Sequence, residues 1–291
     1  MQVSLDSAYE YCRGVTRRRA KNFYYAFIAL PHDQRKGIYA AYAFCRLSDD
    51  YSDENLPLED RTRLLQEYRL QLARAFDGKP DGPVFTALLD TSRRFDIPKE
   101  YFDEIIDGVE MDLTTDRYQT FDDLYRYCYK VASVVGLVCI QIFGYRDLRA
   151  RRYAVDMGIA MQLTNILRDL KEDSGRDRIY LPLDEMDRFH YRPEDLHAEV
   201  INKQFMEMME FQVERARDYF SRSAALLPLL SLRSRVCPAV LRSLYLALLE
   251  RIQARGYDVF SGRVRLNTSE KLALTGKIWL QTLGRGLVGV R

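Results

Sequence analysis

Four aspartates form two pairs with the same spacing in this sequence. Asp49 and Asp53 lie four residues apart, and so do Asp169 and Asp173. On an α-helix this spacing puts both carboxylates of a pair on one face. Each pair follows a mainly apolar segment, which predicts a charged tip on a buried helix. Two such tips facing each other across a cavity repel unless cations lie between them.

Further polar residues accompany both pairs. Asp50 adds an oxygen to the first pair and Asn165 adds one to the second, one turn earlier. Oxygen ligands of this kind suit Mg²⁺, or Mn²⁺ in its place, held together with the phosphate oxygens of a substrate. Arg46 and Arg168 lie beside the pairs, where a guanidinium can bind phosphate through two hydrogen bonds. The pattern predicts a diphosphate site.

An ordinary explanation of the same residues competes with this one. A single pair of aspartates at this spacing is usually a solvated helix face. Arg46 with Asp50, and Arg168 with Glu172, also have the spacing of simple surface salt bridges. Two pairs, each closing an apolar helix, favour the metal site, and the pattern alone leaves both interpretations open.

The chain as a whole predicts an all-α protein. It has 291 residues, 44 Lys and Arg against 42 Asp and Glu, only 15 Gly and 9 Pro, and no linker or repeat, so we expect one domain over 1–291. The balanced charge, without a basic stripe, argues against nucleic-acid binding. Residues 122–143 and 153–170 are apolar nearly all round, which is typical of helices buried in a bundle.

Aromatic residues complete the predicted chemistry. The chain holds 20 Tyr and 14 Phe, many of them near the predicted buried helices. Aromatic faces stabilise cations in a dry pocket, and an apolar tunnel holds a hydrocarbon tail. Most of these tyrosines are also explained as ordinary core residues. Carboxylates, Mg²⁺, a diphosphate and an aromatic pocket together indicate ionisation of an allylic prenyl diphosphate.

Five segments resemble the squalene and phytoene synthases, which join two prenyl diphosphates head to head. They are NFYYAFIALP (22–31), YAFCRLSDDYSDE (42–54), YRYCYKVASVVGL (125–137), MQLTNILRDLKEDSGRDRIYLPLD (161–184) and LYLALLERI (244–252). The resemblance covers most of the chain. It implies an all-α isoprenoid synthase fold, a bundle of long helices with both acidic motifs facing one central cavity.

The resemblance also implies roles for individual residues. Mg²⁺ would be held by Asp49, Asp50 and Asp53 in one site and by Asn165, Asp169 and Asp173 in the other. Tyr127 matches a family tyrosine placed near the reacting carbons, and Arg168 joins it and the aspartates as a catalytic residue. The implied substrate-binding residues are Asn22, Tyr42, Arg46, Gln162, Asn165, Tyr180 and Tyr245. A basic residue near the C-terminus is expected to be Arg265 or Lys271.

Segments 107–113 and 127–145 look most like bacterial presqualene diphosphate synthases of hopanoid pathways. This implies a prenyltransferase that condenses two farnesyl diphosphates and releases diphosphate, without NADPH. Phytoene, dehydrosqualene and complete squalene synthesis are the alternatives within the family, and a non-catalytic helical lipid-binding protein is the alternative outside it. With no export signal at the N-terminus, we expect a cytoplasmic protein, with peripheral membrane contact suggested by its lipophilic substrates.

Overall fold

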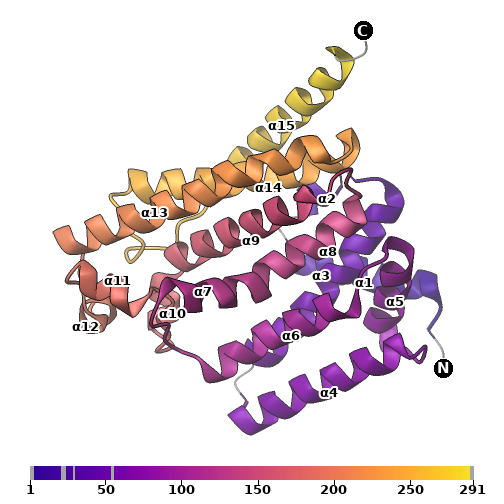
Figure 1. Cartoon of the computed structure of the whole chain (residues 1–291), viewed down its shortest axis with the longest axis horizontal. Coiled ribbons are helices and arrows are strands. Elements are labelled where there is room, and N and C mark those ends of the chain that lie inside the picture. Colours follow the sequence, from indigo (N-terminus) through magenta and orange to yellow (C-terminus); the bar gives the residue numbers. More distant parts are fainter. Residues whose placement is uncertain (1–2, 21–23, 29, 54–55, 289–291) are drawn as a thin grey trace.

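The computed structural model describes residues 3–288, except 21–23, 29 and 54–55. Within this part of the chain the regular elements are helices, and β-structure is limited to two isolated bridges, Arg117 with Ile179 and Tyr145 with Leu230. The all-α prediction is confirmed. Figure 1 shows long helices lying side by side, with α7, α8 and α9 between the α4–α6 side and the α13–α14 side.

The first part of the chain runs through α8. Its helices are α1 (Leu5–Arg19), α2 (Tyr24–Phe27), α3 (His32–Asp53), α4 (Leu58–Phe76), α5 (Gly82–Phe95), α6 (Lys99–Thr114), α7 (Phe121–Cys128), the π-helical segment η1 (Tyr129–Ser133) and α8 (Val134–Phe143).

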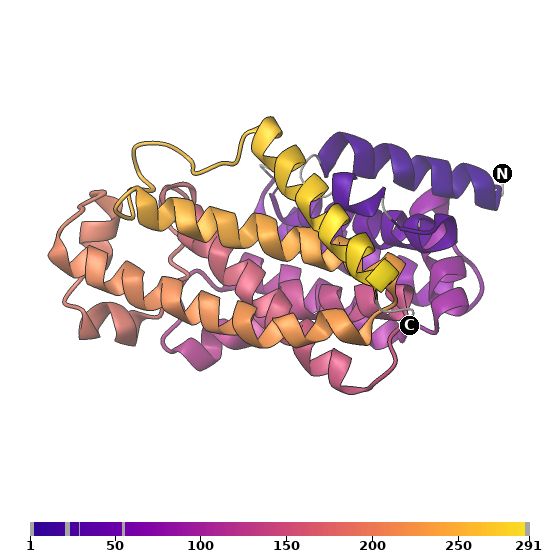
Figure 2. The same cartoon turned by 90° about the horizontal axis from the view of Figure 1, so that it is seen from above.

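The second part begins with α9. Its helices are α9 (Arg149–Arg168), α10 (Leu170–Ser174), α11 (Leu183–Arg188), α12 (Pro193–His197), α13 (Lys203–Ser223), the 3₁₀ segment η2 (Ala224–Leu229), α14 (Leu232–Ala254) and α15 (Thr268–Val288). Helix α15 contacts α14 and crosses it in Figure 2, and in Figure 1 its C-terminal end projects past the body of the bundle.

The buried helices predicted from the sequence lie at the centre of the bundle. The stretch Phe121–Phe143 is continuous through α7, η1 and α8, and Thr120 begins it with a capping box to Asp123. This stretch is long and apolar enough to cross a membrane by length and composition, and half of its apolar window is buried inside the protein. It contacts α3, α6 and α9, which is the position of a core helix.

Two close approaches fix the π-helical turn after Tyr127. A Cβ on Gly158 of α9 would lie 2.5 Å from the Cα of Ser133, and a Cβ on Gly108 of α6 would lie 2.8 Å from Val131. The Ser133 hydroxyl also donates to the carbonyl of Val155, 2.9 Å away. Glycine therefore lets α6 and α9 approach the wide turn closely, and this packing holds the helix that carries Tyr127.

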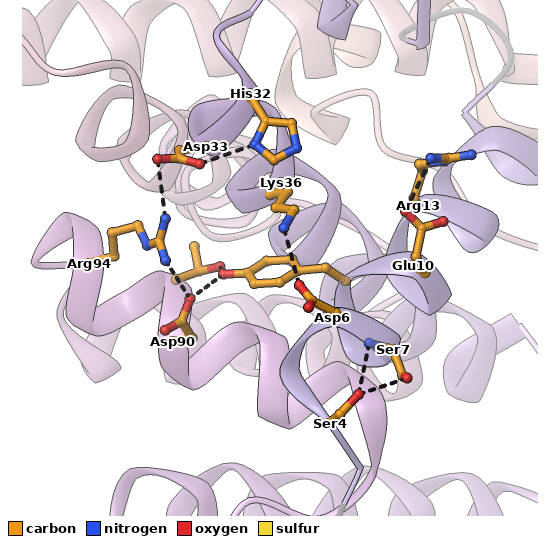
Figure 3. Close-up of polar contacts among 12 residues, drawn as sticks. Ser4, Asp6, Ser7, Glu10, Arg13, His32, Asp33, Lys36, Asp90 and Arg94 are labelled. Atoms are coloured by element: carbon orange, nitrogen blue, oxygen red, sulfur yellow. Dashed lines mark hydrogen bonds and ion pairs between the residues drawn. The ribbon is translucent and has the colours of Figure 1, made fainter.

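A polar network fastens the N-terminal helix to its neighbours (Figure 3). The Tyr9 hydroxyl of α1 donates to Asp90, 2.7 Å away on α5. Arg94 of α5 pairs with Asp33 of α3, and Lys36 lies over the Tyr9 ring. Because these contacts join α1, α3 and α5, they hold the helix that ends in the first acidic motif.

Candidate active site

The first acidic motif closes α3. Asp49 and Asp50 lie on its last turns, and the side chain of Asp53 lies outside the described residues, as does Asn22. Asp50 pairs with Arg46 one turn earlier, and Arg19 of α1 approaches the same carboxylate at 3.7 Å. The surface salt bridge considered in the sequence is thus present.

Tyr42 belongs to the same face of α3. Burial raises the pKa of Tyr42 to about 12, with Arg46 acting against this shift and Asp49 adding to it. The three side chains therefore interact electrostatically, as their spacing predicts for one helix face. A phenol, a guanidinium and two carboxylates consequently gather at this end of α3.

The second acidic motif lies where α9 breaks. Helix α9 ends at Arg168 and α10 begins at Leu170, so Asp169 is the junction and not an interior helical residue, a correction to the continuous helix expected. The Asp173 amide still bonds the Asp169 carbonyl at 2.9 Å. The turn between the two aspartates is therefore preserved across the break.

Two arginines hold Asp169. Arg168 donates from Nε to Asp169 Oδ1 at 2.8 Å and from Nη2 to Oδ2 at 2.5 Å. Arg263, from the segment between α14 and α15, places Nη2 2.8 Å from Oδ1 and Nε 3.7 Å from Glu172. Arg263 is thus a basic residue near the C-terminus that contacts the second motif, and the sequence analysis did not assign it; the roles expected of Arg265 or Lys271 stay predictions.

The Asp173 carboxyl has a raised pKa. Burial, together with the like charge of Asp169, raises the pKa of Asp173 to about 7, although Arg176 and Arg178 act in the opposite direction. The shift comes mainly from the loss of water around the Asp173 carboxyl, and the repulsion from Asp169 adds to it. A bound cation would relieve this repulsion.

Three predicted substrate-binding residues surround the same end of α9. Asn165 donates to Gln162 at 3.2 Å. Tyr245 of α14 is buried, and its pKa is raised by that burial, with Arg168 and a hydrogen bond with Asn165 acting against the shift. The structure therefore brings Gln162, Asn165 and Tyr245 together with Arg168, as predicted.

Tyr127 and Tyr180 meet at a residue that the sequence analysis did not assign. The Tyr180 hydroxyl donates to Asp112 Oδ1 at 2.8 Å, and the Tyr127 hydroxyl donates to Oδ2 at 3.2 Å. Arg178 donates to the Asp112 carbonyl at 2.7 Å. Asp112 lies on the last turn of α6, and Asp116, four residues on, follows the end of that helix. The sequence analysis assigned neither of them, although Asp112 lies in the segment 107–113 singled out for its resemblance.

The two acidic motifs are related through α8. This helix contacts both α3 and α9, and Asp112 adds to the raised pKa of Asp173, so the tyrosine cluster adjoins the second motif. One cavity shared by both motifs stays a prediction from the resemblance.

The donor set of the second motif fits a hard divalent cation. Asn165, Asp169 and Asp173 offer oxygen ligands, which Mg²⁺ prefers. Over the described ranges, no group of three His, Cys, Asp or Glu side chains is gathered closely enough to hold a metal. Arg168 and Arg263 occupy the Asp169 carboxylate instead, so a metal would compete with them.

A long-helix bundle with carboxylate and arginine clusters at helix ends defines the isoprenoid synthase class of all-α enzymes. The profile of the squalene/phytoene synthase family matches residues 16–270. The chain belongs to this family, whose members are head-to-head prenyltransferases.

Named relatives and solved structures agree with this membership. The chain is 38% identical over 282 residues to 15-cis-phytoene synthase of Synechococcus elongatus, covering 93% of this chain and 92% of the relative. It is 36% identical to phytoene synthase of Mycobacterium tuberculosis, covering 92% and 89%. A dehydrosqualene synthase structure superposes with a TM-score of 0.89 at 29% identity, covering 96% and 98%. Squalene synthase HpnC from Alicyclobacillus acidocaldarius gives 0.83 at 31%, covering 88% and 97%.

Proposed function

We propose that this protein catalyses the Mg²⁺-dependent head-to-head condensation of two identical allylic prenyl diphosphates, forming a cyclopropylcarbinyl diphosphate and releasing diphosphate. The observation that carries the proposal is the second motif, where Asp169 pairs with two arginines and Asp173 adjoins the Tyr127–Tyr180 cluster through Asp112. Family membership supports the same chemistry.

The residues have distinct tasks in this reaction. Asn165, Asp169 and Asp173 would hold one Mg²⁺, and the aspartates of the first motif would hold another; bound metal neutralises charge on the departing diphosphate. Arg168 and Arg263, which pair with Asp169 in the structure, would then be available to bind phosphate oxygens.

The surroundings of the site serve the carbocation that remains. The rings of Tyr127 and Tyr180 stack 5.2 Å apart, and both side chains are buried. Aromatic faces stabilise a cation electrostatically, and their burial keeps out water that would quench it. The double bond of the second substrate then attacks the cation, and proton loss closes the cyclopropane ring.

Two substrate pairs fit this chemistry. Two farnesyl diphosphates would give presqualene diphosphate, as the resemblance of 107–113 and 127–145 suggests. Two geranylgeranyl diphosphates would lead to phytoene, and the named phytoene synthases at 36–38% identity favour this second candidate. Both pairs use the same first condensation, so the residue roles above hold for either.

Incubation of the purified protein with Mg²⁺ and each labelled prenyl diphosphate, with and without NADPH, tests the proposal. Mass analysis of intact diphosphates and hydrocarbons reads the outcome. A C30 diphosphate unchanged by NADPH identifies presqualene diphosphate synthesis, and a C40 hydrocarbon identifies phytoene synthesis. A C30 hydrocarbon identifies squalene or dehydrosqualene synthesis. If neither substrate gives a product, the proposal is refuted and the lipid-binding alternative is favoured.

A further inference from the structure

Asp112 is the shared acceptor of a buried tyrosine cluster. Its two carboxylate oxygens accept hydrogen bonds from different tyrosines, Tyr180 on Oδ1 at 2.8 Å and Tyr127 on Oδ2 at 3.2 Å. The three residues come from separate parts of the chain: the end of α6, the end of α7 and the segment after α10. One carboxylate therefore accepts from both tyrosines, whose hydroxyls also hydrogen-bond each other.

A third tyrosine packs on this pair without using its hydroxyl. The Tyr118 ring lies 5.7 Å from that of Tyr180 and 5.5 Å from that of Tyr127. Its buried hydroxyl has no hydrogen-bond partner among the described residues. Asp112 thus accepts hydrogen bonds from two of the three neighbouring tyrosines. Tyr118, whose hydroxyl does not bond Asp112, serves as a control for the other two.

The hydrogen bonds to Asp112 point the tyrosine protons toward its carboxylate. A tyrosine whose proton points to a carboxylate keeps its oxygen lone pairs for another partner. Burial and the nearby charge of Asp112 raise the pKa of both Tyr127 and Tyr180, so both phenols are neutral at physiological pH. A neutral phenol bonded to a carboxylate can accept one proton at oxygen while passing its own proton on.

We propose that Asp112 is the positioning residue for proton removal in the condensation, acting through Tyr127. This inference deepens the proposed function and rests on it. After C1′ of the ionised substrate bonds to C2 of the other, positive charge lies on C3. The C1′–H bond then breaks, and its electron pair forms the C1′–C3 bond of the cyclopropane. The proton goes to the Tyr127 oxygen as the Tyr127 proton passes to Asp112.

The decisive variants are Asp112→Asn, which keeps size but removes the charge, and Asp112→Glu, which restores it. We expect Asp112→Asn to lower kcat by about 10²-fold or more, the contribution typical of a positioned base, with KM within about threefold. Asp112→Glu is expected to recover at least about tenfold of that loss. With substrate deuterated at C1, the isotope effect on single turnover should rise in Asp112→Asn, because proton removal becomes limiting.

Tyr118→Phe is the matched control, since it keeps the stacked ring and removes only the unpartnered hydroxyl. Its kcat is expected to stay within about twofold of the wild-type value. The double variant Asp112→Asn with Tyr127→Phe should be little slower than the slower single variant, because the two residues act in one step.

Several results would overturn the inference. These are a wild-type kcat in Asp112→Asn, additive losses in the double variant, or an unchanged isotope effect. A loss that appears only as weaker Mg²⁺ binding would make Asp112 a metal ligand and also refute it. If Asp112→Asn fails to fold, Asp112→Glu and Tyr127→Phe give the same test. Wild-type inactivity on both prenyl diphosphates, by contrast, refutes the proposed function itself.

Discussion

The two acidic motifs share a spacing but differ in their electrostatic surroundings. On α3, Asp50 pairs with Arg46 of its own helix, and both side chains are 28% exposed. At the α9–α10 junction, Asp169 is held by Arg168 and by Arg263 from far along the chain, and the Arg168 and Asp169 side chains are 16% and 17% exposed. The second motif is therefore the more enclosed of the two.

Because of this difference, losing an ion pair costs the two motifs different amounts of free energy. A partly exposed carboxylate loses its ion pair at little cost, because water replaces the partner. An enclosed carboxylate needs a replacement cation whenever its arginines leave, since an unpaired buried charge is costly. The second motif is therefore the place where metal binding and arginine release are coupled most tightly.

The largest expected effect comes from removing one carboxylate of each motif. Asp49→Asn and Asp169→Asn should each lower Mg²⁺-dependent turnover by about 10³-fold, because each removes charge that would hold a cation at the departing diphosphate. Product formation under saturating Mg²⁺ measures this. Asp60→Asn, on the exposed face of α4 beside Arg63, is the control and should retain normal turnover. Normal turnover in either motif variant contradicts the assignment.

Parts of this arrangement follow from the sequence, and others do not. Segments that are apolar nearly all round predicted the central helices, and the repeated aspartate spacing located both motifs. Arg263 was missed because its contact with Asp169 depends on the path of the chain after α14, which no local pattern encodes. Asp112 was missed because its contacts with Tyr127 and Tyr180 join distant parts of the chain, which no local spacing encodes. The π-helical turn η1 was also missed. Gly108 and Gly158 approach this turn closely, and such approaches between helices leave no periodic signal in the sequence.

The second effect concerns the stability of the protein without metal. The pKa of Asp173 is raised to about 7 from an ordinary value of 3.8, so between these values the folded protein binds more protons than the unfolded chain. Stability should therefore fall as pH rises from about 4 to 7 and level off above that. Asp173→Asn should remove this slope and, at pH 8, raise the free energy of unfolding by roughly 2–4 kcal/mol.

Urea unfolding at several pH values, in the presence of a chelator, measures this effect. Asp218→Asn, an exposed change on α13, should keep the slope. Added Mg²⁺ should stabilise the wild-type protein more than Asp173→Asn, because only a ligand of the folded state shifts the equilibrium. A pH slope that survives in Asp173→Asn would assign it to other groups.

A smaller effect separates the arginines of the two motifs. Arg263→Gln removes a competitor for Asp169, so Mg²⁺ alone should bind about fivefold more tightly, corresponding to roughly 1 kcal/mol. Arg19→Gln removes only a 3.7 Å contact to Asp50 at the more exposed motif and should change Mg²⁺ affinity by less than about twofold. Calorimetric titration of each variant provides the comparison. Equal shifts in both variants would show that enclosure does not distinguish the motifs.

The smallest expected effect comes from a change at the N-terminal cap of α7, the helix that carries Tyr127. It tests whether this cap or the packing against α6 and α9 positions the helix. Thr120→Ala removes the cap of α7 and should lower the free energy of unfolding by about 1 kcal/mol. Because Gly108 and Gly158 fix the turn after Tyr127 from both sides, kcat should remain within about twofold. Thr62→Ala, which removes a hydroxyl contact inside α4, is the matched control and should cost less than about 0.5 kcal/mol. If Thr120→Ala lowers kcat strongly while the protein stays folded, the cap and not the interhelical packing positions Tyr127.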